Sequence, residues 1–493
     1  MKQTIGLLLI LSFLILQPSI AQTGVLERAE PESLGLPSKA IRELCDSLTS
    51  LPMTDIHSVM ILRHGKVAAE MFPEPFAPEY RHTVYSCSKT LVGMAVGIAI
   101  SEHRLCLDDR IAPYFTDVLP DTVSAHLAAM RIRDLLTMSS GIVPDWTLRE
   151  TVSDWSRAWL AKPVQEPGRT FMYDSMSTYM LSAIIQKVSG TSLLDYLKSH
   201  VFNALGITEV EWEVSSEGYN TGGWGLHIQT ESLAKIGLLL LNKGCWNGQQ
   251  LIPAYWVEEM MKKQIDEGRQ GYGYQMWPCE YPTAARLDGA YGQYVLIIPE
   301  KDMVVVITEC TAIDGIRQRR LVWNRLMPQV AEEALPAAPK GKMSINYVLP
   351  YPEGKRRSAA SFLDKTFELN PNTLDWKEIR LHREDAGMTL EVINSEGIRI
   401  PIRLGYRQWL KTMTEAKPAY SVTAQGRMAG ISGPFVVAGS YAWKGKDALN
   451  IELHYVNWIT SLEVRIAASD DDVKIEAVLN HAQDPIVLYE GKK

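Results

Sequence analysis

The stretch VYSCSKT, residues 84–90, places Ser86 three positions before Lys89 and continues into the apolar run LVGMAVGIAI. Residues three apart lie on the same face of a helix, so the two side chains should project into one space. A serine hydroxyl needs a base to take its proton, and a lysine can be that base when burial lowers its pKa. The spacing therefore favours a nucleophilic serine and a lysine base at the start of a helix.

The S-x-x-K pattern is weak by itself, because about two chance matches are expected in a chain of this length. A second copy, Ser232 with Lys235, lies in the segment TESLAKIG. In that copy Thr230 is typical of a helix N-cap, and Leu and Ile at helical spacing form a buried stripe. We interpret this copy as part of a structural helix.

A segment downstream offers a partner for Ser86. The sequence PGRTFMYDSMSTYMLSAII, residues 167–185, contains a Pro-Gly turn, then Tyr173-Asp174-Ser175, then a helical pattern. A tyrosine hydroxyl between a lysine and a serine can relay a proton or, as phenolate, act as a base. The alternative is a core tyrosine with a hydrogen-bonded hydroxyl.

Length and composition predict a packed chain of two domains. The 493 residues are 46% hydrophobic and 22% charged, with a formal net charge of -7. A chain this long exceeds one ordinary hydrophobic core. No basic face is visible, so we expect no nucleic-acid partner, since binding a polyanion requires clustered cations.

The N-terminus is typical of a signal peptide. Lys2 precedes an apolar run over residues 5–16, and Ser19-Ile20-Ala21 carries small residues where a signal peptidase cuts. We expect residues 1–21 to be removed after Ala21. The mature protein is then periplasmic or secreted, without a stable membrane span; the alternative is an uncleaved anchor.

Cysteine spacing permits disulfides without requiring them. All six cysteines precede residue 311, and they stand at positions 45, 87, 106, 245, 279 and 310. None forms a C-x-x-C pair or a His/Cys cluster with zinc spacing, so we expect no metal and no cofactor.

Periodicity changes near residue 335. Residues 22–335 alternate helical patterns with strand-like runs, which predicts a mixed α+β domain. Residues 336–344 have linker composition, and 345–493 contain short alternating runs separated by turn residues. The second part is therefore predicted to be an all-β domain, a sandwich or a closed barrel.

Several phrases together resemble the serine hydrolases with the fold of class C β-lactamases and penicillin-recognising enzymes. That family uses S-x-x-K, then Y-x-N or Y-x-S, then K-T-G on a strand. Ser86 to Lys89 match the first motif, and Tyr173 to Ser175 the second. Connecting phrases such as IRDLLTMSSGI and GGWGLHIQTESLAKIG also match, over residues 50 to 310. The resemblance implies an antiparallel sheet flanked by helices, with a helical subdomain, followed here by a sandwich or lipocalin-like barrel.

The third motif departs from the β-lactamase pattern. Leu287-Asp288-Gly289 stands in place of K-T-G, and the phrase G-x-x-G-Q before an apolar strand resembles the branch of 6-aminohexanoate dimer hydrolases. The resemblance implies an oxyanion hole from the backbone N–H groups of Ser86 and Ala290. Because K-T-G grips a substrate carboxylate and Asp288 cannot, β-lactams are less expected as substrates.

The remaining candidates are placed near the substrate by the same resemblance. Ser175 occupies the position of the family's Asn, and Gly289 and Gln293 flank the expected oxyanion residue. His227, in GGWGLHIQT, is a candidate substrate contact.

Other catalytic patterns fit less well. No G-x-S-x-G nucleophile elbow is present, and no histidine has a neighbourhood that marks it as a triad base.

We therefore expect an exported serine hydrolase that cleaves a small ester or amide, with Ser86 as nucleophile and Lys89 and Tyr173 as general base and acid. One alternative is a D,D-carboxypeptidase or β-lactamase that acts on cell-wall peptides or β-lactams. Another is a non-catalytic ligand-binding protein on the same fold. The oligomeric state stays open.

Overall fold

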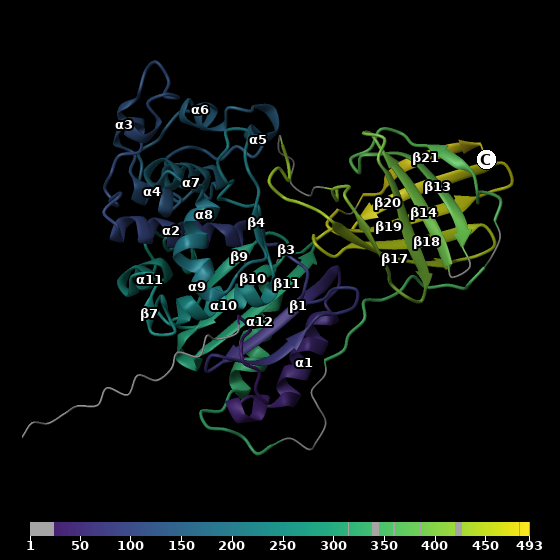
Figure 1. Cartoon of the computed structure of the whole chain (residues 1–493), viewed down its shortest axis with the longest axis horizontal. Coiled ribbons are helices and arrows are strands. Elements are labelled where there is room, and N and C mark those ends of the chain that lie inside the picture. Colours follow the sequence, from purple (N-terminus) through teal and green to yellow (C-terminus); the bar gives the residue numbers. More distant parts are fainter. Residues whose placement is uncertain are drawn as a thin grey trace, which may run out of the picture.

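Two large sheets organise the chain, as the computed structural model in Figure 1 shows. It describes residues 24–313, 315–337, 345–357, 360–384, 387–419, 426–482 and 484–492. We call residues 24–337 the first domain and residues 345–492 the β domain. The expected signal segment and most of the expected linker lie outside the described residues.

The sheet of the first domain is antiparallel and six-stranded. In spatial order its strands are β2 (Lys66–Met71), β1 (Thr54–Arg63), β11 (Met303–Thr311), β10 (Gln293–Ile298), β9 (Ala285–Gly289) and β8 (Trp277–Pro278). The strands β1 and β11 pair from Thr54↔Thr311 to Arg63↔Met303, which joins the two ends of the domain. Their buried residues alternate between the two faces, so both faces must be covered by helices.

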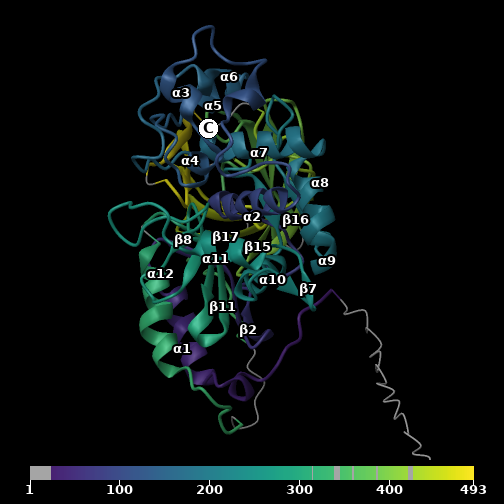
Figure 2. The same ribbon diagram turned by 90° about the vertical axis from the view of Figure 1, so that its left-hand side faces the viewer.

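Helices cover both faces of this sheet. On one face lie α1 (Ser38–Thr49) and α12 (Ile316–Leu321), and on the other α10 (Thr230–Leu241) and α2 (Ser88–Ser101). Figure 2 shows α2 between the sheet and a group of further helices. These are α3 (Ala125–Ala129), α4 (Ile132–Leu136), α5 (Leu148–Thr151), α6 (Trp155–Leu160), α7 (Ser175–Ser189) and α8 (Leu193–Leu197). Two further helices, α9 (Asn203–Leu205) and α11 (Ala254–Met261), lie below α2 in that view, on the side of the sheet. The expected α+β domain with a helical subdomain is confirmed.

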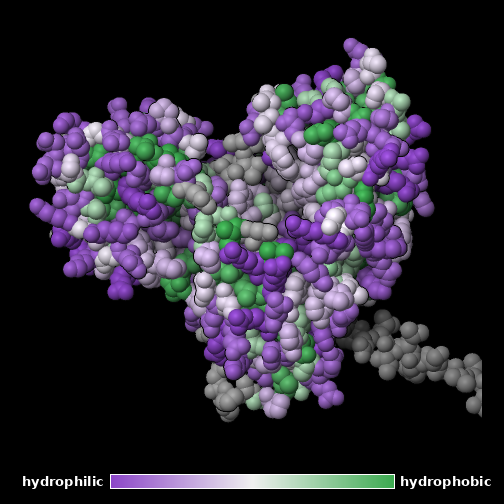
Figure 3. All heavy atoms as spheres, turned by 180° about the vertical axis from the view of Figure 1, so that it is seen from behind, coloured by the Kyte–Doolittle hydropathy of each residue, from purple (hydrophilic) through white to green (hydrophobic). Residues whose placement is uncertain are grey.

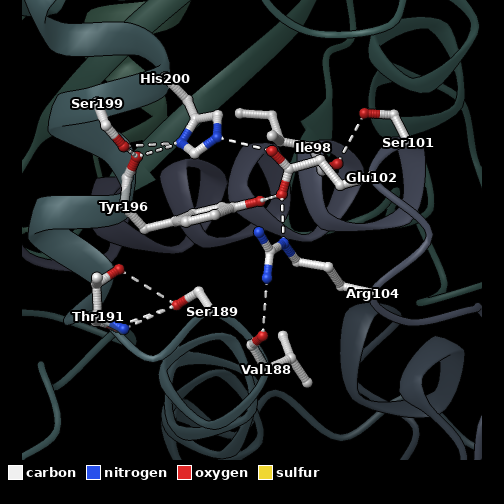
Figure 4. A network of polar contacts seen from close by, with 10 residues as sticks. All are labelled: Ile98, Ser101, Glu102, Arg104, Val188, Ser189, Thr191, Tyr196, Ser199 and His200. Carbon is white, nitrogen blue, oxygen red and sulfur yellow. Dashed lines mark hydrogen bonds and ion pairs between the residues drawn. The ribbon is translucent and has the colours of Figure 1, made fainter.

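Helix α2 is buried on all sides, which explains why its sequence is apolar around its whole circumference. Its far end is held by a polar network (Figure 4). Glu102 accepts hydrogen bonds from Tyr196 Oη at 2.8 Å, Arg104 Nε at 2.6 Å and His200 Nε2 at 2.8 Å. The network ties the helix that follows Ser86 to the segment around α8.

The β domain is a single curled antiparallel sheet with one parallel contact. Its strands are β12 (Thr366–Glu368), β13 (Trp376–Glu384), β14 (Gly387–Asn394), β15 (Arg399–Tyr406), β16 (Leu410–Thr414), β17 (Phe435–Trp443), β18 (Ala448–Tyr455), β19 (Ser461–Ala468), β20 (Asp472–Leu479) and β21 (Ile486–Lys492). Burial alternates along β15 and β20, as for strands with one face on a core. Just after β12, Asn370 donates its N–H to Leu488 O of β21 at 2.8 Å, so the sheet nearly closes on itself. The expected all-β fold is confirmed.

The two domains share a packed interface beside the start of α2. Tyr85 and Cys310 of the first domain belong to the apolar core of the β domain. Asp55 Oδ2 accepts hydrogen bonds from Ser461 Oγ at 3.1 Å and Asn480 Nδ2 at 3.3 Å. A small sheet of β3 (His82–Thr83), β5 (Leu226–Ile228) and β4 (Val210–Trp212) also lies here, and Val214 donates to Ala429 O.

The surface is mostly hydrophilic on the face seen in Figure 3, with hydrophobic residues in small groups. Among the described residues, no helix has the length and apolar character that a membrane crossing demands. Within the same part of the chain, no group of three or more metal-binding side chains is arranged to hold a metal ion. All six cysteines are free thiols.

Candidate active site

Ser86 lies in a short 3-10 turn, Tyr85–Cys87, at the point where the chain enters α2. Tyr85 has a φ of 44°, a conformation that is uncommon for a bulky residue. The turn is held by Cys87 N–H donating to Val84 O at 3.1 Å and by Ser88 Oγ donating to Tyr85 O at 2.5 Å. Its neighbours are buried while Ser86 keeps partial exposure, so the turn presents this one hydroxyl.

Lys89 is buried, with 1% of its surface exposed, directly beside Ser86. Its Nζ lies 3.0 Å from Ser86 Oγ, 3.0 Å from Ser175 Oγ and 2.5 Å from Gly223 O. An ammonium group has three donors, and these three acceptors match them. Neutral Lys89 would keep a lone pair free to accept the Ser86 proton.

The pKa of Lys89 is lowered to about 7. Burial is the largest cause, because it removes water from the ammonium, and the nearby Arg149 guanidinium acts in the same direction. Asp174 opposes them. Near neutral pH a large fraction of Lys89 is therefore unprotonated and able to act as a base.

Tyr173 completes the group of predicted catalytic residues. It precedes α7, its hydroxyl is hydrogen-bonded with Ser86, and Lys89 Nζ lies 4.9 Å from the centre of its ring. Burial is the main reason that the pKa of Tyr173 is raised above its usual range. The phenol therefore holds its proton at neutral pH, which suits a proton donor better than a phenolate base.

Helix α7 positions this part of the site. Asp174 caps the helix by accepting the Met176 N–H at 2.9 Å, and it also accepts Trp159 Nε1–H at 2.8 Å. Ser175, the first residue of α7, is buried with its hydroxyl against Lys89. The structure thus brings Ser86, Lys89, Tyr173 and Ser175 together.

Gly223 is part of the site although sequence reasoning did not single it out. A Cβ at this position would lie 2.5 Å from Ser175 O, so only glycine lets the carbonyl approach Lys89 so closely. The two adjacent glycines in GGWG are the signal that could have indicated a close backbone approach.

The expected oxyanion turn lies on the other side of Ser86. Gly289 ends β9 so close to the nucleophile turn that a Cβ there would lie 2.3 Å from Val84 O. Gly289 and Ala290 line the same pocket as Ser86. Gln293 is fully buried and supports the turn from below, donating from Nε2 to Ala290 O at 3.3 Å and to Glu309 O at 2.5 Å.

His227 lies away from the pocket. It is buried on β5 at the domain interface, stacked on Trp458 of the β domain with ring centres 5.0 Å apart. Its Nε2 is 3.9 Å from Glu213 Oε1. The structure therefore places His227 in the domain contact and does not bring it to Ser86.

Asp288 carries an ion pair that the sequence reasoning missed. Arg286 Nε lies 2.7 Å from Asp288 Oδ2, and Arg319 Nη1 of α12 lies 3.7 Å from the same oxygen. Residues two apart on a strand share a face, so Arg286 could have been paired with Asp288 from the sequence. The carboxylate at the position of the family's K-T-G is thus neutralised by arginines.

These residues surround one pocket of about 980 Å³. Its aromatic lining includes Tyr173 and Trp277, whose ring centres lie 5.6 Å apart. Its charged lining comprises five arginines and three carboxylates, namely Arg149, Arg269, Arg286, Arg319, Arg320, Glu267, Glu280 and Asp288. The pocket therefore has an excess of positive charge among its described residues.

Comparisons with known proteins identify the family of the chain. The Beta-lactamase family model matches residues 57–311, about half of the chain. The chain is 24% identical over 321 residues to a 6-aminohexanoate-dimer hydrolase of Paenarthrobacter ureafaciens, covering 58% of this chain and 81% of that protein. A putative 6-aminohexanoate-dimer hydrolase from Bacillus anthracis superposes with a TM-score of 0.51 at 20% identity, over 61% of this chain and 85% of that one.

A putative β-lactamase from Bacteroides dorei superposes with a TM-score of 0.50 at 14% identity, over 59% of this chain and 99% of that one. At these identities the structural neighbours show the fold alone. The family match includes both the turn that carries Ser86 and strand β9 with Gly289. The expected resemblance is confirmed: the chain belongs to the β-lactamase-related family of serine hydrolases.

Proposed function

We propose that the protein is an exported serine hydrolase that cleaves an ester or amide through an acyl-enzyme on Ser86. The observation that carries this proposal is the buried Lys89, whose Nζ lies 3.0 Å from Ser86 Oγ and whose pKa is lowered to about 7. A structural lysine would be stabilised by carboxylates, whereas this one contacts hydroxyls and a backbone carbonyl.

In the first half-reaction neutral Lys89 takes the Ser86 proton as Oγ attacks the substrate carbonyl carbon. The N–H groups of Ser86 and Ala290 stabilise the oxyanion, a contribution of about 3 kcal/mol per donor. Tyr173 gives its proton to the leaving oxygen or nitrogen as that bond breaks, and the proton held by Lys89 restores the phenol. Ester or amide becomes acyl-enzyme plus alcohol or amine.

In the second half-reaction a water replaces the leaving group. As that water attacks the acyl carbon, the Tyr173 oxygen takes one of its protons and passes its own phenol proton to neutral Lys89. The proton then returns to Ser86 Oγ as the acyl bond breaks, which releases the acid and regenerates the site.

A serine-directed fluorophosphonate probe tests the proposal. Wild-type protein should be labelled and should hydrolyse p-nitrophenyl esters, and Ser86→Ala should lose both. Ser232→Ala is a matched control, because Ser232 belongs to the second S-x-x-K copy and is buried in α10. Unchanged labelling in Ser86→Ala would exclude the assigned nucleophile.

Lys89→Arg keeps the positive charge but cannot release its proton near neutral pH. We expect ester hydrolysis to fall by about 10² to 10⁴, the range for loss of a general base. Full activity in Lys89→Arg would contradict the assigned base.

Export is tested separately, by N-terminal sequencing of protein from the periplasm, where the mature chain should begin after Ala21.

A second candidate function is hydrolysis of a carboxylate-bearing cell-wall peptide or β-lactam. The observation that favours it is the arginine excess in the pocket, since Arg286 and Arg319 neutralise Asp288. Incubation with nitrocefin and penicillin, followed by mass measurement of the protein, separates the two. A stable or turned-over penicilloyl adduct on Ser86 would support this second function; no adduct together with ester hydrolysis would support the first.

A further inference from the structure

The β domain reaches the pocket of the first domain at one residue. Among the described residues that line the pocket, all belong to residues 85–320 except His481. His481 follows β20 and precedes β21, at the end of the sheet that meets the first domain. One residue that lines the pocket thus comes from a part of the chain outside the β-lactamase family match.

The turn that carries His481 is held firmly in place. The neighbouring Asn480 donates from Nδ2 to Asp55 Oδ2 at 3.3 Å and to Ile459 O at 2.9 Å. The Asn480 backbone N–H donates to Ser461 O at 3.1 Å. One of these contacts crosses to the first domain, so the position of His481 is set by the domain interface.

Ring contacts connect His481 to the residues next to Ala290 and Ser86. The His481 ring meets Tyr291 edge-on, with centres 5.4 Å apart, and Tyr291 directly follows Ala290. Tyr291 in turn contacts Tyr85 at 5.5 Å, and Tyr85 directly precedes Ser86. His481 therefore lies beyond Tyr291 as seen from the reacting carbonyl, where it can contact a substrate group distant from the cleaved bond.

The hydrogen bonds of Asn480 determine which ring nitrogen of His481 carries the proton. Because Nδ2 of Asn480 donates to Asp55 and Ile459, its Oδ1 is the acceptor that faces His481 Nδ1 at 3.3 Å. An amide oxygen only accepts, so Nδ1 of His481 is protonated. Burial lowers the pKa of His481, so the ring is neutral at pH 7 and its Nε2 is a hydrogen-bond acceptor.

We propose that His481 is a specificity-determining residue, whose Nε2 accepts a hydrogen bond from an amide or amine N–H of the substrate, distant from the cleaved bond. This inference rests on the hydrolase activity proposed above. It assigns the β domain a part in substrate selection, and it favours substrates that carry a nitrogen function beyond the reacting carbonyl.

The test compares two esters that differ in one hydrogen-bond donor. These are p-nitrophenyl 4-acetamidobutanoate and its N-methyl counterpart, with p-nitrophenyl acetate as a substrate too short to reach His481. In wild-type protein kcat/KM should favour the N–H ester by about three- to tenfold, the usual range for one hydrogen bond. The preference should lie mainly in KM.

His481→Phe keeps a ring against Tyr291 and removes the acceptor, so the preference should fall to about one. Turnover of p-nitrophenyl acetate should stay within about twofold, which shows that the variant is folded. His382→Ala is the matched control, because His382 belongs to the same domain but lies on β13, outside the residues that line the pocket. It should keep the wild-type preference.

Two outcomes overturn the inference and are distinguishable. If His481→Phe hydrolyses p-nitrophenyl acetate normally and keeps the N–H preference, or if wild type shows none, His481 does not select substrates while the hydrolase function stands. If wild type hydrolyses no ester and takes up no fluorophosphonate, the proposed function fails and this inference fails with it.

Discussion

The pKa of Lys89 makes the pH dependence of ester hydrolysis the sharpest test of the proposed chemistry. With a pKa of about 7, half of the lysine is neutral at pH 7 and about one part in a hundred at pH 5. Since only neutral Lys89 accepts the Ser86 proton, kcat/KM should fall about fifty-fold between these two pH values. It should level off above about pH 8.

No descending limb is expected below about pH 10. The pKa of Tyr173 is raised by burial above that of a free tyrosine, so the proton donor stays protonated through this range. The assay is initial-rate hydrolysis of p-nitrophenyl acetate from pH 5 to 9.5. Absorbance is read at the isosbestic wavelength, because the released p-nitrophenol itself titrates.

Removing a nearby positive charge should move the midpoint in a defined direction. Arg149 lowers the pKa of Lys89, so Arg149→Gln should shift the ascending limb to higher pH. Arg269→Gln is the matched control: it removes an exposed arginine from the same pocket, one that does not contribute to the shift of Lys89. A flat wild-type profile, or equal shifts in both variants, would refute the assignment of Lys89 as the base.

Three further predictions concern stability and geometry. Lys89→Met should unfold at a higher urea concentration than wild type at pH 7. The free energy that wild type loses by burying Lys89 in its neutral form falls as pH rises from 7 toward 10.5, so the difference in unfolding free energy between the two proteins should shrink by roughly 2 kcal/mol at pH 9. A difference that stays constant with pH would contradict the lowered pKa of Lys89. Gly223→Ala should reduce kcat at least tenfold, because its Cβ meets Ser175 O at 2.5 Å, whereas Gly445→Ala, with open space, should be neutral. Glu102→Gln should lower the melting temperature by a few degrees at pH 7. Desolvation opposes ionisation of Glu102, but its hydrogen bonds outweigh desolvation and lower its pKa below 4.5, so the loss of melting temperature should be present above pH 4.5 and shrink as pH falls further. A loss that persists at pH 2 would show that the Glu102 carboxylate is not its cause.

Much of the candidate site could be predicted, because its residues are close together in the sequence. Ser86 and Lys89 are three residues apart at a helix start, and Tyr173 and Ser175 lie at the start of another helix. Helical periodicity places such pairs without knowledge of the tertiary fold. The third element of the site, Gly223 O, is a backbone carbonyl, which has no side chain to signal its role.

Less of the β domain and of its contacts with the first domain could be predicted from the sequence. Alternating runs in the sequence mark seven of its strands, but not β12, β16 and β21, which are short or largely exposed and have at most one buried residue each. His481 lies in a turn with no periodicity. It contacts Tyr291, and its neighbour Asn480 donates to Asp55, and both partners are far away in the sequence. His227 was predicted from its place in the phrase GGWGLHIQT, which does not reveal which face of β5 its side chain lies on.

Cys87, between the two serines of the first motif, has a structural role that the sequence alone leaves open. Burial raises the pKa of its thiol well above the usual range, so it is no rival nucleophile to Ser86. Its Sγ donates to Gln293 O at 3.3 Å, and the Gln293 side chain holds Ala290 O. The turn that carries Ser86 and the turn that carries Ala290, more than 200 residues apart in sequence, are thus joined by two buried residues. Gln293 therefore acts on the position of Ala290 rather than on substrate, and Cys87 ties that position to Ser86.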